Sequence, residues 1–270
     1  MAILILIFIF ILGSIIGSFL NVVIYRLNTG RTIVKGKSMC MTCGHKLRWY
    51  ELIPIVSYFI QMGKCRSCKS KISFQYPVVE VLTGLIFLIV AIKFVPFLLY
   101  SFWLYVIYVS LYIILFSILI VIFVYDLRHK IIPNKLAFPF IALSFLCMLV
   151  NLLVFGRTFS WLTLLDVFSG VIIALPFAII WLLSKGKLMG FGDVKLMMGI
   201  GWMLGISSGS FAIIIAFWIG AIAGLIMMAF SRKKVGFKTE IPFAPFLILG
   251  ILITFLFGFN FATLINLFTF

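Results

Sequence analysis

Six acidic residues are all that this chain of 270 residues contains, and two of them stand where apolar stretches meet polar ones. Asp126 closes a long apolar stretch, and Asp193 opens another directly after the run Gly190-Phe191-Gly192. A carboxylate near hydrocarbon is costly, so such a residue is a functional candidate by default. We therefore take Asp126 and Asp193 as the candidate catalytic residues, with the activation of water as the chemistry they could share.

Each aspartate, taken singly, also has an ordinary structural explanation. Asp193 could cap the N-terminus of the helix that follows it, and Asp126 could pair with nearby Arg128 or His129. The glycines at 190 and 192 favour a functional site, because glycine permits close backbone approach and unusual dihedrals beside Asp193.

The helix expected after Asp193 is short, because it covers about 194–206 before the polar run 207–210. About 14 residues span roughly 21 Å, whereas the hydrocarbon core of a bilayer is about 30 Å thick. If the far end of this helix reaches the opposite interface, Asp193 lies several Å inside the membrane. A carboxylate at that depth needs a water-filled recess, and hydrolysis within a membrane needs the same.

Four of the five cysteines form two pairs with the same spacing, Cys40-x-x-Cys43 and Cys65-x-x-Cys68. Paired CxxC sequences suit tetrahedral coordination of Zn²⁺ by thiolates. Two disulfides are the alternative, which a reducing cytoplasm disfavours. Four thiolates leave no position for water, so we expect a structural zinc site. The fifth, Cys147, is expected in the core or facing lipid.

The remaining acids differ in their surroundings. Glu51 and Glu80 flank the second half of the cysteine segment and are candidates for a second site, or for ion pairs between this segment and the membrane helices. Asp166 is expected at the outer interface. Glu240 stands in a basic loop and is expected to be solvated.

The composition predicts that most of the chain lies in a membrane. It is 65% hydrophobic and only 10% charged, whereas a soluble domain carries about a quarter charged residues. A transmembrane helix needs about 20 apolar residues. We expect an all-α polytopic membrane protein with a polar insertion at 26–76 and about eight transmembrane helices, over 3–25, 77–95, 100–125, 134–155, 162–184, 194–206, 210–230 and 241–268.

The first apolar stretch resembles a signal peptide, but it lacks a basic start and its apolar run is too long. We expect it to be retained as the first span.

The basic residues predict the orientation of these helices. Segments 26–76, 126–135, 185–195 and 232–238 hold ten, three, three and four Lys and Arg residues, which is 20 of the 22. With eight spans all four segments fall on one side, and the excess of Lys and Arg marks that side as cytoplasmic. Both termini then lie outside, and the cysteine segment and both aspartates lie on the cytoplasmic side.

Other classes of function fit the sequence less well. The net charge of +16 could indicate nucleic-acid binding, but no basic stripe alternates with exposed aromatic residues. The chain has two histidines and no HExxH motif, which excludes the usual zinc metalloproteases. A proton-coupled transporter and a non-enzymatic membrane scaffold stay open as alternatives.

Five motifs in order resemble the type IV prepilin peptidases, membrane aspartic proteases of the GxGD type, over nearly the whole chain. The motifs are Gly17 to Leu27; Cys40 to Cys43 with Leu47, Trp49, Glu51 to Pro54 and Ser57; Glu80 to Gly84; Asp126 with Ile132-Pro133-Asn134; and Gly190 to Lys195. The resemblance implies that Asp126 and Asp193 are catalytic and that Gly190, Gly192 and Lys195 support them. The family frequently has a proline between the first two cysteines, where this chain has Met41-Thr42.

The resemblance also implies the substrate and the division of the chain. The substrate is a type IV prepilin or pseudopilin precursor, whose short basic leader is removed at the cytoplasmic face of the bacterial membrane. Many members then methylate the new N-terminus with S-adenosylmethionine, and Glu51 and Glu80 are the acids placed nearest that activity. A protease without methylation is the alternative. The expected parts are a first span (1–25), a zinc-binding insertion (26–76) and a protease core (77–270).

Overall fold

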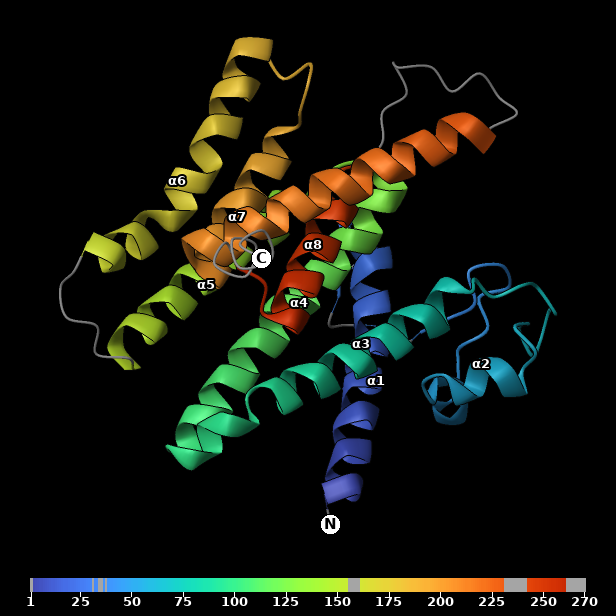
Figure 1. The fold of residues 1–270 in the computed structure, drawn as a ribbon. Coiled ribbons are helices and arrows are strands. Elements are labelled where there is room, and N and C mark those ends of the chain that lie inside the picture. Colours follow the sequence, from blue (N-terminus) through green and yellow to red (C-terminus); the bar gives the residue numbers. More distant parts are fainter. Residues whose placement is uncertain are drawn as a thin grey trace. The chain divides into compact units, whose positions relative to one another are not determined.

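The computed structural model describes residues 2–30, 32–33, 36, 38–154, 161–230 and 242–260, and every regular element in these ranges is a helix. Predictions about segments outside these ranges, Glu240 and the basic segment 232–238 included, lie outside the described residues. The elements are α1 (Ala2–Arg26), η1 (Trp49–Leu52), α2 (Val56–Ile60), α3 (Gln75–Lys93), η2 (Val95–Leu99), α4 (Phe102–His129), α5 (Asn134–Val154), α6 (Trp161–Ser184), α7 (Phe191–Phe230) and α8 (Ala244–Phe257) (Figure 1). The predicted all-α class is confirmed.

The chain forms two compact units, one over Met1–Val121 and one over Ile122–Phe270, and the boundary between them falls within α4. The first contains α1, the polar insertion and α3, and the second contains the last turns of α4 with α5 to α8. Each unit has its own packing, and the two candidate aspartates belong to the second.

In the first unit, α1 and α3 pack closely along small residues. A Cβ on Gly13 would lie 2.8 Å from the Cα of Gly84, and a Cβ on Gly17 would lie 2.8 Å from the Cα of Glu80. Further along, the buried Asn21 donates from Nδ2 to the carbonyl oxygen of Tyr76 over 3.2 Å. Gly13, Gly17 and Gly84 therefore let two membrane helices touch, as small residues do at helix contacts in lipid.

In the second unit, α7 is the central helix and packs against α5, α6 and α8. Small residues again mark the crossings: a Cβ on Gly201 of α7 would lie 2.6 Å from the Cα of Gly170 of α6. At the contact between α7 and α8, Gly250 of α8 packs directly on the backbone of Ala212 of α7. This close packing fixes the position of the N-terminal part of α7, which carries Asp193.

The predicted short helix after Asp193 exists, but its boundaries differ from the expectation. α7 begins at Phe191 and breaks at Gly205, whose backbone has φ 79° and ψ 173°. Only glycine adopts this conformation readily, so the interruption falls there, whereas 207–210 is helical. The break allows α7 to be counted as two helices. The described chain then has eight membrane helices, as predicted: these two together with α1, α3, α4, α5, α6 and α8.

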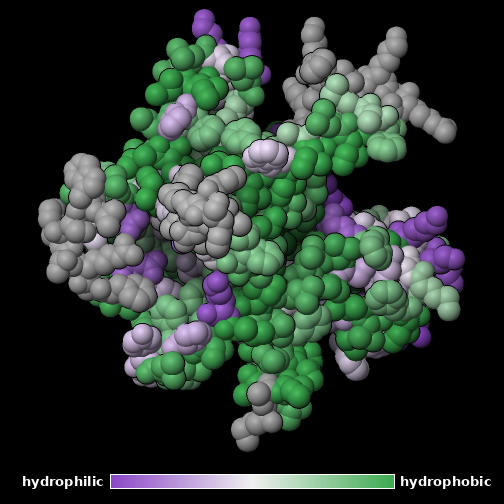
Figure 2. All heavy atoms as spheres, viewed as in Figure 1, coloured by the Kyte–Doolittle hydropathy of each residue, from purple (hydrophilic) through white to green (hydrophobic). Residues whose placement is uncertain are grey.

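Six of the described helices are long and apolar enough to cross a membrane, and α7 is one of them. α8 is shorter than the predicted 241–268, because it ends at Phe257 before Gly258, which takes a left-handed conformation with φ 67°. Figure 2 shows hydrophobic residues over most of the visible surface of the helices, with hydrophilic residues gathered on the insertion. A surface of this kind suits lipid as the surrounding solvent.

Candidate functional site

Asp126 lies in the last turn of α4, which continues to His129 beyond the predicted end at 125. Its side chain is buried, with the residue only 4% exposed. The carboxylate interacts with the backbone N–H of Ala244, the first residue of α8. The other carboxylate oxygen, Oδ2, has no hydrogen-bond partner among the described residues. The positive end of a helix dipole thus faces this acid.

Asp193 lies in the first turn of α7 and is half-buried. Because α7 begins two residues earlier, Asp193 is not its N-cap but its third residue, the position from which the acid of a capping box reaches back to the N-cap N–H. Its carboxylate interacts with the backbone N–H of Gly190. It is also close enough to Asp126 for the charges of the two carboxylates to interact. The structure therefore brings together the two acids that the sequence singled out.

Two contacts join the segments that carry these acids. Gly192 packs against Ile132, in the connection between α4 and α5, where a Cβ on the glycine would lie 2.8 Å from the Cβ of the isoleucine. Lys195 donates from Nζ to Oδ1 of Asn134 over 2.7 Å. The start of α7 is thus fixed against the start of α5, directly after the turn that carries Asp126.

One expectation about the glycines is wrong. Neither Gly190 nor Gly192 has a positive φ, so their backbone dihedrals are ordinary. Gly192 is required for space, because no side chain fits between its backbone and Ile132. Lys195 also lies over the rings of Phe138 and Phe191, each 4.9 Å from its Nζ. Its observed contacts therefore hold the two segments together.

Replacing Gly192 by alanine is expected to lower peptidase activity strongly. The new Cβ would lie 2.8 Å from the Cβ of Ile132, a separation that folded proteins do not tolerate, so the start of α7, which carries Asp193, must shift relative to Ile132. A displacement of about 1 Å at a catalytic pair can cost about a hundredfold in rate. Cleavage of a leader-bearing substrate by purified protein measures this effect.

Gly190→Ala is the matched control for this substitution. Its Cβ would make only an ordinary contact, 3.5 Å from Oδ2 of Asp193. Its activity is expected to stay much closer to that of the wild type. Equal losses in both variants would contradict the role given to the contact between Gly192 and Ile132.

The four cysteines of the insertion converge on one point. Their sulfur atoms all lie within 4.8 Å of one another, and Sγ of Cys40 lies 3.8 Å from Sγ of Cys68. Four sulfurs at about 2.3 Å from a tetrahedral zinc ion lie about 3.8 Å apart. All four are free thiols, so the predicted clustering is confirmed and the alternative of two disulfides is not observed.

The two CxxC segments share one backbone design. Cys40 donates its N–H to the carbonyl of His45, and Cys65 donates to that of Ser70, over 2.9 and 2.8 Å. The residue after each second cysteine is left-handed, with φ 70° at Gly44 and φ 58° at Lys69. Two matching turns of this kind point all four sulfurs to a common centre, as a metal site requires.

The thiols have unequal acidities, and this also suits a cation. The backbone N–H groups of Cys43 and Thr42 lower the pKa of Cys40 to about 5, and the hydroxyl of Ser70 lowers the pKa of Cys68. The N–H of His45 lowers the pKa of Cys43, but burial and the sulfurs around it outweigh this and raise that pKa to about 11. Four thiolates this close need a cation to be ionised together, so the donor set fits a metal.

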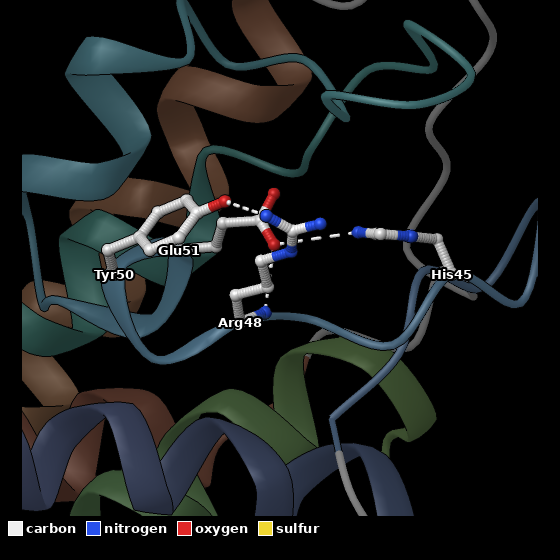
Figure 3. A network of polar contacts seen from close by, with 4 residues as sticks. All are labelled: His45, Arg48, Tyr50 and Glu51. Atoms are coloured by element: carbon white, nitrogen blue, oxygen red, sulfur yellow. Dashed lines mark hydrogen bonds and ion pairs between the residues drawn. The ribbon is translucent and has the colours of Figure 1, made fainter.

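Glu51 lies beside a cavity of about 350 Å³ that is also lined by His45, Arg48, Tyr50, Arg66 and Ser67. One of its carboxylate oxygens, Oε2, accepts the backbone N–H of Arg48 over 2.8 Å and lies 3.5 Å from Nε2 of His45 (Figure 3). The other, Oε1, is buried and has no partner among the described residues. Leaving such an atom unpaired costs about 1–3 kcal/mol, which a ligand with a hydrogen-bond donor would recover.

Glu80 is hydrogen-bonded to a different part of the insertion. Its Oε2 accepts the backbone N–H of Ile55 over 2.7 Å. Ile55 has φ 63° and ψ −59°, and the N–H of Val56 is bonded to the carbonyl of Pro54 over 2.6 Å. This is a strained γ-turn, of the kind that costs about 1–3 kcal/mol and persists only where its surroundings impose it. Glu80 therefore holds a turn four residues after Glu51.

Some site residues were not anticipated from the sequence. The backbone amide of Ala244 beside Asp126 is one, because no side-chain motif marks it. Arg66 and Tyr50 at the cavity are others, with the guanidinium of Arg66 5.3 Å from the centre of the Tyr50 ring. Both stand next to motif cysteines or acids, but nothing in their spacing predicts that they meet.

Comparison with known families identifies the chain. The bacterial peptidase A24 N-terminal domain matches residues 11–94, and the type IV leader peptidase family matches residues 113–225. The chain belongs to the type IV leader peptidase family. It is therefore a membrane peptidase, and the second match covers both candidate aspartates.

Curated relatives of this membrane peptidase extend over nearly its full length. The prepilin leader peptidase/N-methyltransferase of Vibrio cholerae is 31% identical, covering 91% of this chain and 94% of its own. That of Bacillus subtilis is 31% identical over 92% and 93%, and that of Pseudomonas aeruginosa 31% over 92% and 89%. No solved structure matches the chain.

Proposed function

We propose that this peptidase removes the leader from type IV prepilins or pseudopilins and that Asp126 and Asp193 are its catalytic residues. The observation that carries the proposal is the joining of the two acidic segments, by Gly192 on Ile132 and by Lys195 on Asn134, with the two carboxylates within electrostatic reach. The names of the relatives supply the substrate class.

The two carboxylates would act as a general acid and a general base. Two acids this close do not both ionise readily, so they share one proton. The ionised member takes a proton from the attacking water, and the protonated member donates to the carbonyl oxygen of the scissile peptide bond. Oδ2 of Asp126 is buried without a partner among the described residues, so a water or a substrate atom would have to enter the site to reach it. No covalent intermediate is needed.

We propose that cleavage takes place at the cytoplasmic face. The excess of Lys and Arg in segments 26–76, 126–135, 185–195 and 232–238 supports this orientation. It puts the insertion on the same side as the two aspartates and both termini outside. The functional division into a first span (1–25), an insertion (26–76) and a protease core (77–270) is part of the same proposal.

Asp126→Asn and Asp193→Asn are each expected to abolish leader cleavage. General acid–base catalysis contributes about 10²–10⁴-fold per group, and an amide can neither take nor give the required proton. Gel analysis of a prepilin incubated with purified protein in detergent measures the shorter product.

Asp166→Asn is the matched control, because it makes the same chemical change in α6, outside the pair. It is expected to keep its cleavage activity. Cleavage by either dyad variant at the wild-type rate, in protein that stays folded in detergent, would refute the assignment. It would also revive the alternatives of a transporter or a scaffold.

We propose further that Cys40, Cys43, Cys65 and Cys68 hold a structural Zn²⁺ ion. The ion would tie together the two halves of an insertion that has little core of its own.

Elemental analysis is expected to find about one zinc per chain. Cys65→Ser is expected to lose it, whereas Cys147→Ser, which changes a buried cysteine of α5, is expected to keep it. Equal zinc in both variants would contradict the site.

The names of the relatives also support a methyltransferase activity, and we propose that the cavity beside Glu51 serves it. S-adenosylmethionine would supply the methyl group. Arg48 and Arg66 can hold a carboxylate, and the unpaired Oε1 of Glu51 can accept a hydrogen bond from an ammonium or hydroxyl group. Glu80 would act as a positioning residue, because it fixes the turn at Ile55. A protease without methylation is the alternative.

Glu51→Gln is expected to separate the two activities. The amide loses the charge and one of two equivalent acceptors, so binding of S-adenosylhomocysteine, measured by calorimetry, is expected to weaken at least about tenfold. Cleavage by the Asp126 and Asp193 pair is expected to continue unchanged. Unaltered binding and methylation in this variant would exclude the cavity, whereas wild-type protein that cleaves without methylating would support the alternative.

A further inference from the structure

The insertion carries an exposed apolar edge that neither cleavage nor methylation explains. Trp49 is 78% exposed, Phe59 63%, Ile60 75% and Met62 85%. We call these four residues the apolar edge. The elements that carry them, η1 and α2, are in contact, and large exposed apolar side chains on neighbouring elements mark an interaction site. Trp49 comes from η1, whereas the other three belong to α2 and the turn after it.

Two contacts show where the apolar edge lies relative to the start of α3. Glu80 lies five residues inside α3, about 7.5 Å along the helix axis, and its carboxylate holds the N–H of Ile55, directly before α2. In addition, the ring of Tyr58 packs edge-on to that of Phe74, just before α3, with centroids 6.1 Å apart. The segment therefore lies level with the first turns of α3, where that membrane helix begins.

The charges around the edge suit the headgroup region of a bilayer. Lys64, Arg66, Lys69 and Lys71 follow directly after Met62 and are exposed. Exposed apolar residues beside a row of Lys and Arg are typical of segments that lie in the interface and contact anionic lipids. Trp49 adds the residue type that is enriched at this level of a membrane.

We propose that the apolar edge inserts into the lipid interface beside the start of α3, so that the insertion is seated on the bilayer. The turn at Ile55, held by Glu80, directs Val56–Ile60 towards the lipid rather than away from α3. The cysteine cluster and the cavity beside Glu51 are thereby held at the membrane surface. The occupant is lipid, and neither a second copy of the chain nor a substrate helix is needed to cover the edge.

Photo-crosslinking in lipid nanodiscs tests this seating on the full chain. A benzophenone amino acid replaces Phe59, or Ile60 in a second variant. Phe8 of α1, which is 66% exposed on a membrane helix, is the positive control. Lys46, exposed in the first cysteine segment and outside the row Lys64 to Lys71, is the negative control. Retained zinc content reports that the insertion is folded.

After irradiation, mass spectrometry is expected to find lipid adducts at 59 and 60 as at Phe8, at least about tenfold above those at Lys46. An increase of these adducts with the fraction of anionic lipid is also expected. Adducts to protein, or no lipid adduct at 59 and 60 while Phe8 reacts, would overturn the proposal. Neither result would affect the cleavage assay, so failure of the seating is distinguishable from failure of the proposed function.

Discussion

A buried carboxylate at Asp126 is the constraint on which the arrangement of the second unit depends. An ionised acid near hydrocarbon is unstable unless dipoles or hydrogen bonds compensate it. Here the first amide of α8 faces the carboxylate, and the start of α7 brings a second acid close to it. The ends of three helices must therefore meet around one side chain.

Close helix packing makes that meeting possible. In lipid, helices gain little from burying apolar side chains, so they associate through close contact of small residues. Gly170 and Gly201 let α6 and α7 touch, and Gly250 lets α8 approach α7. Gly192 has the same effect at the candidate site, where the absence of a side chain lets the backbone of α7 pack against Ile132. Gly192 and the glycines at the helix crossings therefore serve one purpose, which is to let a backbone approach its neighbour closely.

Much of this was predictable from the sequence because the signals are local. Apolar runs of membrane length predicted the helices, and the spacing of Cys40, Cys43, Cys65 and Cys68 predicted their clustering. The break in α7 was misplaced by two or more residues, because the polar run 207–210 is an obvious signal whereas Gly205 is one glycine among many. The amide of Ala244 and the meeting of Tyr50 with Arg66 could not be predicted, since they depend on tertiary packing between segments with no shared pattern.

The insertion and the aspartate pair are held in place by different kinds of interaction. The pair needs a water-accessible recess at the edge of an apolar environment, and packed helices supply its rigidity. The insertion has almost no core, and its buried hydrophobic residues are few. Its shape comes from point constraints: four converging sulfurs, the hydrogen bond from Ile55 to Glu80, and the bond from Arg48 to Glu51. Such a segment keeps a strained turn only while its anchors hold. The carboxylate of Glu80, fixed within α3, is the anchor that ties this turn to a membrane helix.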